Sequence, residues 1–461
     1  MRDRWRSELE RLLPREDLTA DPDQMYFYGF GPTRLPEVVV FPREAEQIAS
    51  IMKLANTYRV PVIPFGGGTQ LGKAFLPHSG GIGLSTSRMN KILEVDRENL
   101  TVQVEAGVTN QVLQEALRPA NLFFPPDPPR PQWSTVGGEV AANAAGPKRF
   151  AYGAAKDYVL GLEAVTPTAT LVRGGGKTVK NVSGYDLTRL FAGSWGNFGI
   201  ITRVTLRLRP VPEAAELILA RFGKSADALE AARAIIKAGL APTMLELISP
   251  WPGQTAGGGD GSTLFHPELA SLVIGVEGMR EAVDWQEGEL LRVCRGYRPA
   301  ELRKISGAEE QETILASLRQ EPPSSLLSVE APAVRGSLIV PRKQFAAAVN
   351  RLENLASERK ISLGFAGHAG DGYLDFLANG RGNFRQQLLA IAGELDGRLV
   401  LVDEDHDAAN HASNPPPQAP DLPTATLAAR LKASLDPNGI LAPGSKAFLN
   451  AADVQGLPKG V

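Results

Sequence analysis

The feature that most constrains this chain is a run of glycines directly after an apolar segment. Residues 60–65, VPVIPF, have the composition of a buried strand, and residues 66–72 continue it as GGGTQLG. Consecutive glycines weaken a helix or strand, but they allow positive φ angles and a loop whose backbone N–H groups converge. Such a loop binds phosphate oxygens without a cationic side chain. The pattern predicts either a phosphate-binding loop or a tight turn between strands.

The same run comes close to the phosphate-binding loop of nucleoside triphosphatases. Residues 67–73 have the spacing G-x-x-x-x-G-K. The next residue is Ala74, where that motif needs a serine or threonine hydroxyl for Mg²⁺. Pro77 also stands where the helix of the motif should run. These two departures argue against ATP hydrolysis.

Two later segments are also rich in small residues. Residues 125–153 contain Ser134 and Thr135 beside two glycines and then a run of alanines, which let backbone approach a large ligand closely. Residues 193–199, GSWGNFG, lead into a β-branched stretch whose extended backbone could hydrogen-bond the edge of an adenine. Each segment alone could be ordinary packing. Several such loops around one α/β lobe are harder to explain in that way.

Length, charge and cysteine content narrow the remaining classes. A chain of 461 residues exceeds one compact core. Its net charge of −2 argues against a nucleic-acid partner. Cys294 is the only cysteine, which excludes an intramolecular disulfide and a four-cysteine iron–sulfur cluster. We find neither a signal-peptide pattern nor an apolar stretch near the ~20 residues of a membrane span, so we expect a cytoplasmic protein without a transmembrane segment.

Three motifs, taken in order, are similar to a known family. VPVIPFGGGTQLG, STVGGEVAANAAG and GYDLTRLFAGSWGNFGIIT resemble the FAD-binding domain of the p-cresol methylhydroxylase/vanillyl-alcohol oxidase (PCMH/VAO) family, over about residues 36–212. More narrowly, GPKRFAYGAAKDYVLG, VKNVSGYDLTRLFAGS and RLKASLDPNGILAPG resemble the smaller FAD-binding subunits of bacterial glycolate oxidases. That second resemblance extends over nearly the whole chain.

The resemblance implies an α+β protein built around a two-lobed FAD-binding domain of the PCMH/VAO type. We expect a helical lead-in at 1–35 and the FAD-binding domain at 36–212. Alternating helical and strand-like segments in 213–395 independently suggest a ferredoxin-like α+β cap domain. The C-terminal segment, 396–461, should include a helix that packs back on the FAD domain.

The resemblance also implies one bound FAD. The first two small-residue loops would hold its pyrophosphate and ribityl region, and Ile201 would lie near the adenine. The expected contact residues are Gly66, Gly67, Gly68, Thr69, Gln70, Pro125, Thr135, Gly137, Gly138, Ala141, Asn143 and Ile201. Some relatives attach FAD through a histidine in the first loop. Because Thr69 and Gln70 fill that region here, attachment should be non-covalent.

The catalytic motif that the resemblance implies is incomplete. Metal-assisted 2-hydroxy-acid dehydrogenases of this family hold a divalent metal with G-H-x-G-D-G-N-[LI]-H and a later E-H-G. Residues 367–375 read GHAGDGYLD, so His368 matches but Asp375 replaces the second histidine, and the later cluster at 403–406 is DEDH. On a continuous strand, the spacing between His368 and Asp375 places their side chains on opposite faces unless the GDG turn intervenes. We expect His368 to be the candidate catalytic residue. We expect no intact metal site, and the weak candidate ligands that the motif leaves are His368 and Asp375.

Two functions follow from the resemblance. In the first, the chain is the FAD-binding, electron-relaying subunit of a complex that oxidises glycolate or another 2-hydroxy acid. Its partners would then be a catalytic flavin subunit and an iron–sulfur subunit, through which any membrane association would arise. In the second, it is a free-standing FAD-dependent dehydrogenase of D-lactate or glycolate. The incomplete metal motif favours the first, and a non-enzymatic FAD scaffold is a distant third.

Overall fold

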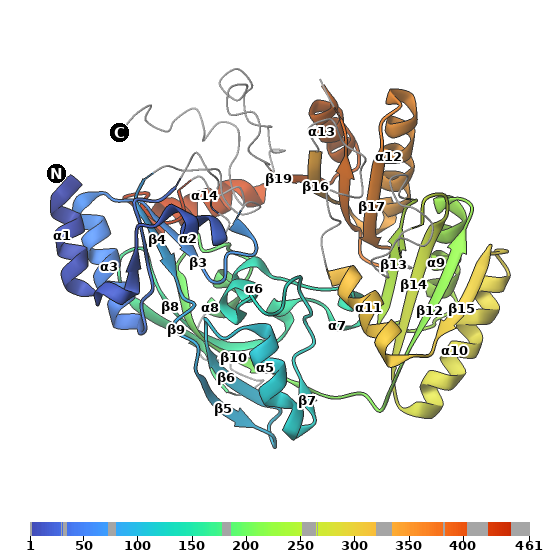
Figure 1. Ribbon diagram of the computed structural model, residues 1–461, viewed down its shortest axis with the longest axis horizontal. Coiled ribbons are helices and arrows are strands. Elements are labelled where there is room, and N and C mark those ends of the chain that lie inside the picture. The colour runs from blue at the N-terminus through green and yellow to red at the C-terminus, as the bar shows by residue number, and fades with distance from the viewer. Residues whose placement is uncertain are drawn as a thin grey trace. The chain divides into compact units, whose positions relative to one another are not determined.

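The chain folds into two compact units (Figure 1). The computed structural model describes residues 2–28, 30, 35–71, 80–177, 186–250, 264, 266–319, 334–380, 383–402 and 423–443. Unit 1 is built from Met1–Ala145, Ala154–Val211 and Asp407–Val461. Unit 2 is built from Gly146–Gly153, which includes α7 (Arg149–Tyr152), and Pro212–His406. Helices and strands alternate in both units, as expected for an α+β protein.

The first sheet of unit 1 has four strands and is covered by a long helix. Its elements are α1 (Arg2–Leu12), β1 (Leu18–Thr19), α2 (Pro22–Phe27), β2 (Val38–Val40), α3 (Ala45–Tyr58), β3 (Val62–Phe65) and β4 (Ile82–Ser85). The strand order is β1-β2-β4-β3, with β2, β4 and β3 parallel. Ile48, Ile51 and Met52 recur at helical spacing along α3 and are fully buried in one core with the strands. Trp5 and Leu9 of α1 join the same core.

The second sheet of unit 1 has five antiparallel strands. Its elements and the neighbouring ones are β5 (Ile92–Asp96), β6 (Thr101–Glu105), α5 (Asn110–Leu117), β7 (Leu122–Phe123), α6 (Val136–Ala142), β8 (Val159–Val165), β9 (Leu171–Gly175), α8 (Leu187–Phe191), β10 (Ile200–Arg207) and β11 (Arg209–Pro210). The order is β5-β6-β10-β8-β9, and β7 pairs separately with β11. Helices α5 and α6 share a core with β6 and β10, for example through Val136, Val140 and Val204.

The last described segment of the chain returns to unit 1. It consists of α14 (Pro423–Leu435) and the residues up to 443. The Val62 N–H donates to the Ile440 carbonyl at 2.7 Å, and the Ala442 N–H donates to the Val62 carbonyl at 2.7 Å. The Lys432 ammonium donates to the Asn197 and Leu441 carbonyls at 2.9 and 2.7 Å. These bonds pair the edge of β3, the strand that leads into the glycine loop.

Unit 2 contains one eight-stranded antiparallel sheet. Its elements are β12 (Ala214–Phe222), α9 (Ser225–Lys237), β13 (Met244–Ile248), β14 (Ala270–Gly278), α10 (Arg280–Arg295), β15 (Glu301–Ile305), α11 (Ala308–Arg319), β16 (Val334–Ile339), α12 (Phe345–Arg359), β17 (Leu363–His368), β18 (Tyr373–Ala378), α13 (Phe384–Glu394) and β19 (Arg398–Val402). The strand order is β15-β12-β14-β13-β17-β18-β16-β19.

This order contains two ferredoxin-like modules joined edge to edge. The first is β12-α9-β13-β14-α10-β15, and the second is β16-α12-β17-β18-α13-β19. Pairing between β13 and β17 joins the two modules into one sheet. The sequence suggested a single cap region ending near 395. The structure instead extends unit 2 through β19, because β19 forms a full ladder with β16.

The two faces of the unit 2 sheet differ in character. Helices α9, α10, α12 and α13 pack on one face and form the main core of the unit with it (Figure 1). The other face, called the second face below, is apolar near β12 and β14, where Ile314 of α11 is buried against it. Its remaining part carries the polar residues described in the next section.

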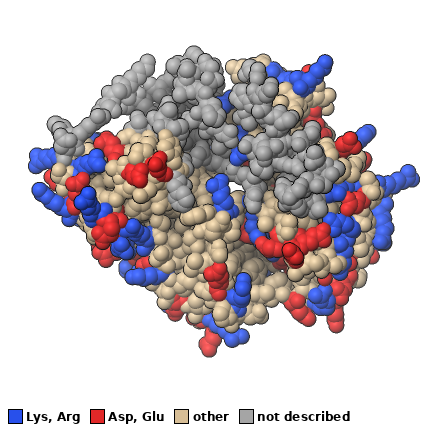
Figure 2. Space-filling view, in the orientation of Figure 1, with Lys and Arg blue, Asp and Glu red and all other residues tan. Residues whose placement is uncertain are grey.

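Charge on the surface is mixed in sign. Figure 2 shows Lys and Arg side chains interspersed with Asp and Glu on the face in view. The helices of the described residues include none with both the length and the apolar character that crossing a bilayer requires.

Candidate functional site

The glycine loop of unit 1 lies against the second small-residue segment. A Cβ atom on Gly66 would overlap the Thr135 hydroxyl, and one on Gly67 would overlap the Trp133 carbonyl oxygen. Only Gly68, with a φ of +81°, has a left-handed backbone among the three. Glycine allows a positive φ at every position of the run, but Gly66 and Gly67 do not adopt one. These two positions need glycine because the glycine loop and the second small-residue segment are in direct contact there.

The backbone donors of the glycine loop are left for a ligand. Among the hydrogen bonds of the described residues, none uses the N–H of Gly66, Gly67, Gly68, Thr69 or Gln70. All five residues are half-buried. A row of N–H groups of this kind suits an anionic group such as a pyrophosphate.

The second segment uses its own N–H groups within the protein. Val136 donates to the Val108 carbonyl and Gly137 to the Ala106 carbonyl, both at 2.8 Å. Thr135 caps α6, because its hydroxyl accepts the Gly138 N–H at 3.3 Å. Because these N–H groups are already engaged, the segment would form part of the wall of a ligand site rather than donate backbone hydrogen bonds to the ligand.

Its two glycines have different surroundings. A Cβ on Gly137 would lie 2.6 Å from the Ala106 Cβ, so the helix needs a glycine there to reach β6. A Cβ on Gly138 would meet only the Thr135 hydroxyl, at 3.1 Å. The space at Gly138 is open on every other side within the described residues, as expected where a ligand approaches.

The third segment joins the first two. The Gly193 N–H donates to the Val140 carbonyl at 3.0 Å, and the Trp195 N–H donates to the Ala141 carbonyl at 2.8 Å. A Cβ on Gly196 would lie 2.9 Å from Cγ of Pro64, two residues before Gly66. Three motifs separated in sequence thus meet in one region of unit 1.

The other predicted FAD contacts lie around this region. Asn143 ends α6 with a left-handed φ of 51°, and its side-chain oxygen accepts the Lys156 N–H at 3.0 Å. Pro125 is buried in the loop between β7 and α6. Ile201 lies on β10 opposite Ala164 of β8, and its side chain is buried in the core. The individual FAD contacts stay predictions, but free N–H groups beside open space fit a phosphate-bearing cofactor.

Glu139 is a residue that sequence reasoning missed. It lies on α6 with 1% of its surface exposed, and burial raises the pKa of its carboxyl to about 8 against hydrogen bonds from Asn110 and Ser134. Its Oε1 atom has no partner among the described residues. The signal in the sequence was a lone charge inside the small-residue run VGGEVAA.

In unit 2, one cross-strand row runs over the second face of the sheet. Residues directly opposite each other in a ladder point to the same face. The row, in strand order, is Arg303, Leu219, Val273, Glu246, His368, Tyr373, Ile339 and Arg398. The next row on the same face includes Arg221, Asp375 and Ser337. His368 and Asp375 therefore share one face, because the turn between β17 and β18 intervenes between them.

His368 pairs with a buried carboxylate. Its Nδ1 lies 2.5 Å from Oε1 of Glu246, and the two side chains are 15% and 5% exposed. The imidazole stacks on Tyr373, with ring centroids 5.4 Å apart and planes 27° apart. Burial alone would lower the pKa of His368, but the Glu246 carboxylate raises it to about 9. Burial in turn raises the pKa of the Glu246 carboxyl, and the His368 imidazole opposes that rise.

Asp375 is held by two hydroxyl groups. Ser337 and Tyr373 both donate to its Oδ1, the latter at 3.0 Å. Across the described residues, no group of three or more His, Cys, Asp or Glu side chains gathers as a metal site would require. The expectation that no intact metal site forms stays a prediction. Three other candidates from the sequence lie outside the described residues. They are the DEDH cluster at 403–406, His411, and the segment 72–79, which carries the triphosphatase-like residues and His78.

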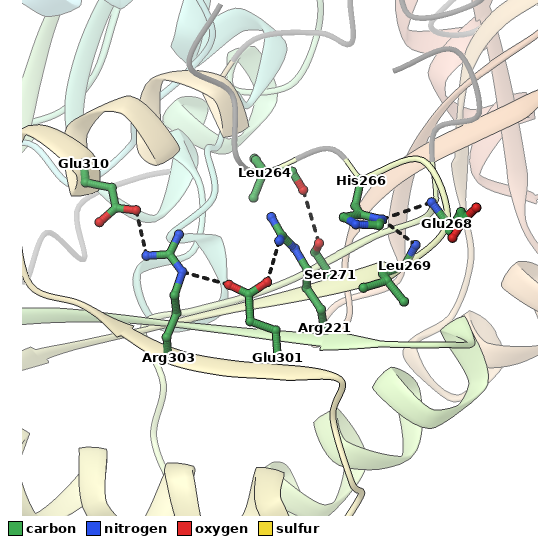
Figure 3. Close-up of polar contacts among 9 residues, drawn as sticks. All are labelled: Arg221, Leu264, His266, Glu268, Leu269, Ser271, Glu301, Arg303 and Glu310. Atoms are coloured by element: carbon green, nitrogen blue, oxygen red, sulfur yellow. Dashed lines mark hydrogen bonds and ion pairs between the residues drawn. The ribbon is translucent and has the colours of Figure 1, made fainter. Parts of the chain in front are cut away.

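A second charged cluster lies at the β12–β15 end of the same face (Figure 3). Glu301 accepts hydrogen bonds from Arg221 at 2.5 Å and from Arg303 at 3.0 Å. Arg303 also donates to Glu310 of α11 at 2.7 Å. Nearby, His266 Nδ1 accepts the N–H groups of Glu268 and Leu269, so this imidazole supports a turn. The four charges balance, and the cluster resembles a structural brace more than a binding site.

Glu246 was also missed from the sequence. It is the single charge in the apolar strand MLELI, where every residue is buried. A lone carboxylate in such a strand needs a partner, because an unpaired buried charge is costly. That signal pointed to a buried pair, but only the pairing of β13 with β17 identifies His368 as its partner.

Comparison with known proteins places the chain in a family. Residues 36–175 match the FAD binding domain, and residues 211–378 match the FAD linked oxidases, C-terminal domain. The chain is 34% identical to glycolate oxidase subunit GlcD of Bacillus subtilis over 354 residues, which cover 76% of this chain and 75% of that protein. It is 32% identical to D-lactate dehydrogenase of Archaeoglobus fulgidus, covering 95% and 98% of the two chains.

A solved structure of p-cresol methylhydroxylase with substrate bound has the same fold, with a TM-score of 0.72 at 17% identity, covering 98% of this chain and 97% of that one. The predicted PCMH/VAO-type fold and the predicted cofactor are both confirmed. The chain belongs to the family of FAD-linked oxidases that combine these two domains, and it is an FAD-dependent oxidoreductase.

Proposed function

We propose that this chain is the FAD-binding subunit of a cytoplasmic complex that oxidises a small 2-hydroxy acid such as glycolate or D-lactate. The observation that carries the proposal is the buried imidazole of His368, paired with Glu246, in a chain whose relatives are named for glycolate and D-lactate oxidation. Unit 1 holds FAD non-covalently, and the second face of unit 2 binds the substrate anion.

The chemistry of a 2-hydroxy acid matches the residues available. Its oxidation to a 2-oxo acid removes a hydride equivalent from C2 and a proton from the hydroxyl group. FAD, when bound, supplies the two-electron acceptor for this reaction. The substrate carboxylate needs a cationic hydrogen-bond donor, and the His368 ring, when protonated, is one. The nearby Asp375 carboxylate can accept a hydrogen bond from the substrate's hydroxyl group. The two protein hydroxyls that donate to Asp375 hold it in place.

The electrons would leave through partner subunits. A catalytic flavin subunit and an iron–sulfur subunit are the partners of this proposal. Its support is that the Bacillus subtilis relative is named as a subunit. The sole cysteine, Cys294, is fully buried in α10, and burial raises the pKa of its thiol to about 11. A single inert thiol cannot ligate a cluster, so the onward carrier must come from elsewhere.

A second candidate is a free-standing FAD-dependent 2-hydroxy-acid dehydrogenase. The similarity to the Archaeoglobus fulgidus D-lactate dehydrogenase favours it, because that similarity extends over nearly the full length of both chains. The departure at Asp375 weighs against it, since a carboxylate already engaged by two hydroxyls stands where the family motif has a histidine.

Anaerobic flavin reduction separates the two candidates. The isolated chain, loaded with FAD, is mixed with millimolar glycolate or D-lactate, and the oxidised flavin band is followed. We expect it to stay nearly unbleached over minutes without the partners, because nothing in the described residues of the isolated chain polarises the substrate hydroxyl group as a metal would. It should bleach once the catalytic flavin subunit is added and supplies the electrons. Rapid, saturable bleaching of the isolated chain would establish the free-standing dehydrogenase. Acid precipitation of the yellow protein should release the flavin, and flavin retained in the pellet would contradict non-covalent binding.

The two glycines of α6 give a matched test of the FAD site. Gly138→Val places a side chain in the open space beside the glycine loop, so FAD affinity should fall while the melting temperature of the flavin-free protein changes little. Gly137→Val instead forces α6 away from Ala106 and should lower the stability of the flavin-free protein. Normal FAD binding by the Gly138 variant would show that the cofactor does not approach there.

A further inference from the structure

The outer side of helix α10 exposes a large aromatic side chain. The helix packs on the sheet of unit 2 through its buried residues, Val283, Leu290 and Cys294 (Figure 1). On the side that faces away from the sheet, Trp285 is 64% exposed, more than any other tryptophan of the described residues. Single exposed apolar side chains are common on protein surfaces, so Trp285 gains meaning only from its neighbours.

The first of these neighbours is Gly288. It lies one turn after Trp285 on the same side of the helix and is exposed. Glycine inside a helix is destabilising relative to alanine, and close packing is a common reason for it. Here a Cβ atom at position 288 would meet nothing within 4 Å beyond the backbone of its own helix. The described part of the fold therefore has room for a side chain, and the bare backbone suits a group that approaches from outside the chain.

Opposite charges flank these two residues. Four exposed residues follow one another on this side of α10 at helical spacing, and this stripe consists of Glu281, Trp285, Gly288 and Arg292. Acid toward the N-terminus and base toward the C-terminus would suit the dipole of any helix, but the dipole does not explain the tryptophan and glycine between them. Arg292 also pairs with Glu289 one turn earlier. Because that pair is exposed and weak, the guanidinium remains available to a second carboxylate.

The stripe is complementary to itself when it is reversed. The step from Glu281 to Trp285 is as long as the step from Gly288 to Arg292. An antiparallel pair of these helices can therefore place Trp285 of one copy over Gly288 of the other. The same register places Glu281 opposite Arg292. A two-fold axis repeats each contact, so shape and charge are both satisfied twice in one arrangement.

We propose that this stripe is a homodimer interface, in which two copies of the chain pair their α10 helices antiparallel and each Trp285 covers the partner's Gly288. The occupant is a second copy because one register matches both the aromatic side chain with the gap and the acid with the base. An aromatic anchor at the centre with charged residues at the rim is the usual anatomy of an interface. The dimer goes beyond the proposed oxidation and does not depend on it.

Sedimentation of the full-length FAD-loaded protein tests the dimer. One helix per copy makes a small interface, so we expect monomer to convert to dimer between about 1 and 200 µM. Trp285→Ala and Gly288→Gln should each raise the dimer Kd on the order of 10- to 100-fold. Glutamine favours a helix more than glycine, so Gly288→Gln should not lower the melting temperature of the monomer. Leu427→Ala truncates an exposed apolar residue of α14 and should leave the dimer Kd unchanged.

Charge reversal tests the register. Glu281→Arg and Arg292→Glu each place like charges opposite one another in their own homodimers, so both should dimerise more weakly. An equal mixture of the two variants should form a mixed dimer that is tighter than either homodimer, because every contact then joins opposite charges. The two positions lie about 16 Å apart along one helix, so they cannot compensate each other within one copy. Native mass spectrometry measures the three dimers, and the preference should shrink at about 1 M salt.

Each outcome supports or overturns the homodimer. A wild type that stays monomeric up to about 200 µM overturns it, and so does a dimer that Trp285→Ala and Gly288→Gln leave unchanged. A mixture without preference for the mixed dimer overturns the antiparallel register. If α10 becomes protected from hydrogen exchange only when other subunits are added, the stripe binds a different protein and the homodimer is likewise wrong. None of these results alters the flavin reduction expected under the proposed function.

Discussion

Two regions of the second face of unit 2, one at its β12–β15 end and one in the middle, both carry charge, but they use it differently. At the β12–β15 end, Arg221, Glu301, Arg303 and Glu310 form a chain of two positive and two negative charges (Figure 3). Three of these side chains are about one-third exposed, at 32–39%. In the middle of the sheet, Glu246 and His368 are 5% and 15% exposed and pair directly with each other.

The difference shows that charge on a sheet face says little without burial. In a partly exposed ion pair, each charged group exchanges its interaction with water for an interaction of similar strength with its partner. Each such pair therefore contributes little to stability. A buried pair is different, because removing one partner leaves the other charge without solvent. The exposed chain is therefore tolerant to substitution, whereas the buried pair is sensitive and leaves one imidazole nitrogen for a ligand.

The largest expected effect is on stability. His368→Ala should lower the free energy of unfolding by about 3–5 kcal/mol, because Glu246 is left buried without a partner. Arg303→Ala should cost about 1 kcal/mol or less. Denaturant titration, combined with hydrogen exchange of the β17 and β18 peptides, measures both. Similar losses in the two variants would remove the distinction between the two regions.

A double variant sharpens the same point. Replacing the pair with apolar residues, Glu246→Met together with His368→Leu, should recover most of the stability that His368→Ala loses, because no buried charge remains. A double variant as unstable as His368→Ala would mean that shape rather than charge governs this site.

The next effect is on pH dependence. His368 has a folded pKa of about 9, above its unfolded value of about 6.5, so its contribution to stability is complete below pH 6.5 and is lost as the pH rises through 9. The free energy of unfolding should fall across that window by at most about 1.4 kcal/mol per pH unit. The double variant should lack this decline. Arg303→Ala should keep the decline, because it leaves the Glu246–His368 pair intact.

The smallest expected effect is on salt dependence. Raising ionic strength from about 0.05 to 1 M shortens the Debye length to about 3 Å and screens exposed charges. The difference in stability between wild type and Arg303→Ala should therefore shrink toward zero. The difference between wild type and His368→Ala should persist, because water and ions do not enter a buried pair. Equal screening of both would contradict the burial that separates them.

Much of unit 1 could be anticipated from local pattern. The strand at 62–65 lies within the apolar segment 60–65, whose composition indicated a buried strand. The sequence showed glycine at positions 66 and 67 but not the reason for it. The reason is that Trp133 and Thr135, in a loop distant in sequence, leave no room for a Cβ atom at Gly66 and Gly67. Glycine tolerates both a positive φ and a close approach, so sequence cannot separate the two.

Unit 2 shows the opposite balance. Its helix–strand alternation suggested one ferredoxin-like lobe, and the doubling into two modules became visible only when β13 paired with β17. The motif around His368 was recognisable, but the role of Glu246 depended on strand register. A slip of one residue would turn Glu246 toward the helix-covered face.

By itself, the sequence determined the α+β class, the FAD-binding family, the glycine loop and the single cysteine. These depend on residue type and local order, which a chain carries before it folds. Only the tertiary structure decided which glycines are needed for contact between loops, that His368 and Asp375 share a face, and that a buried carboxylate holds the imidazole. These depend on pairing between segments far apart in the chain, and burial then sets how strongly each charge acts.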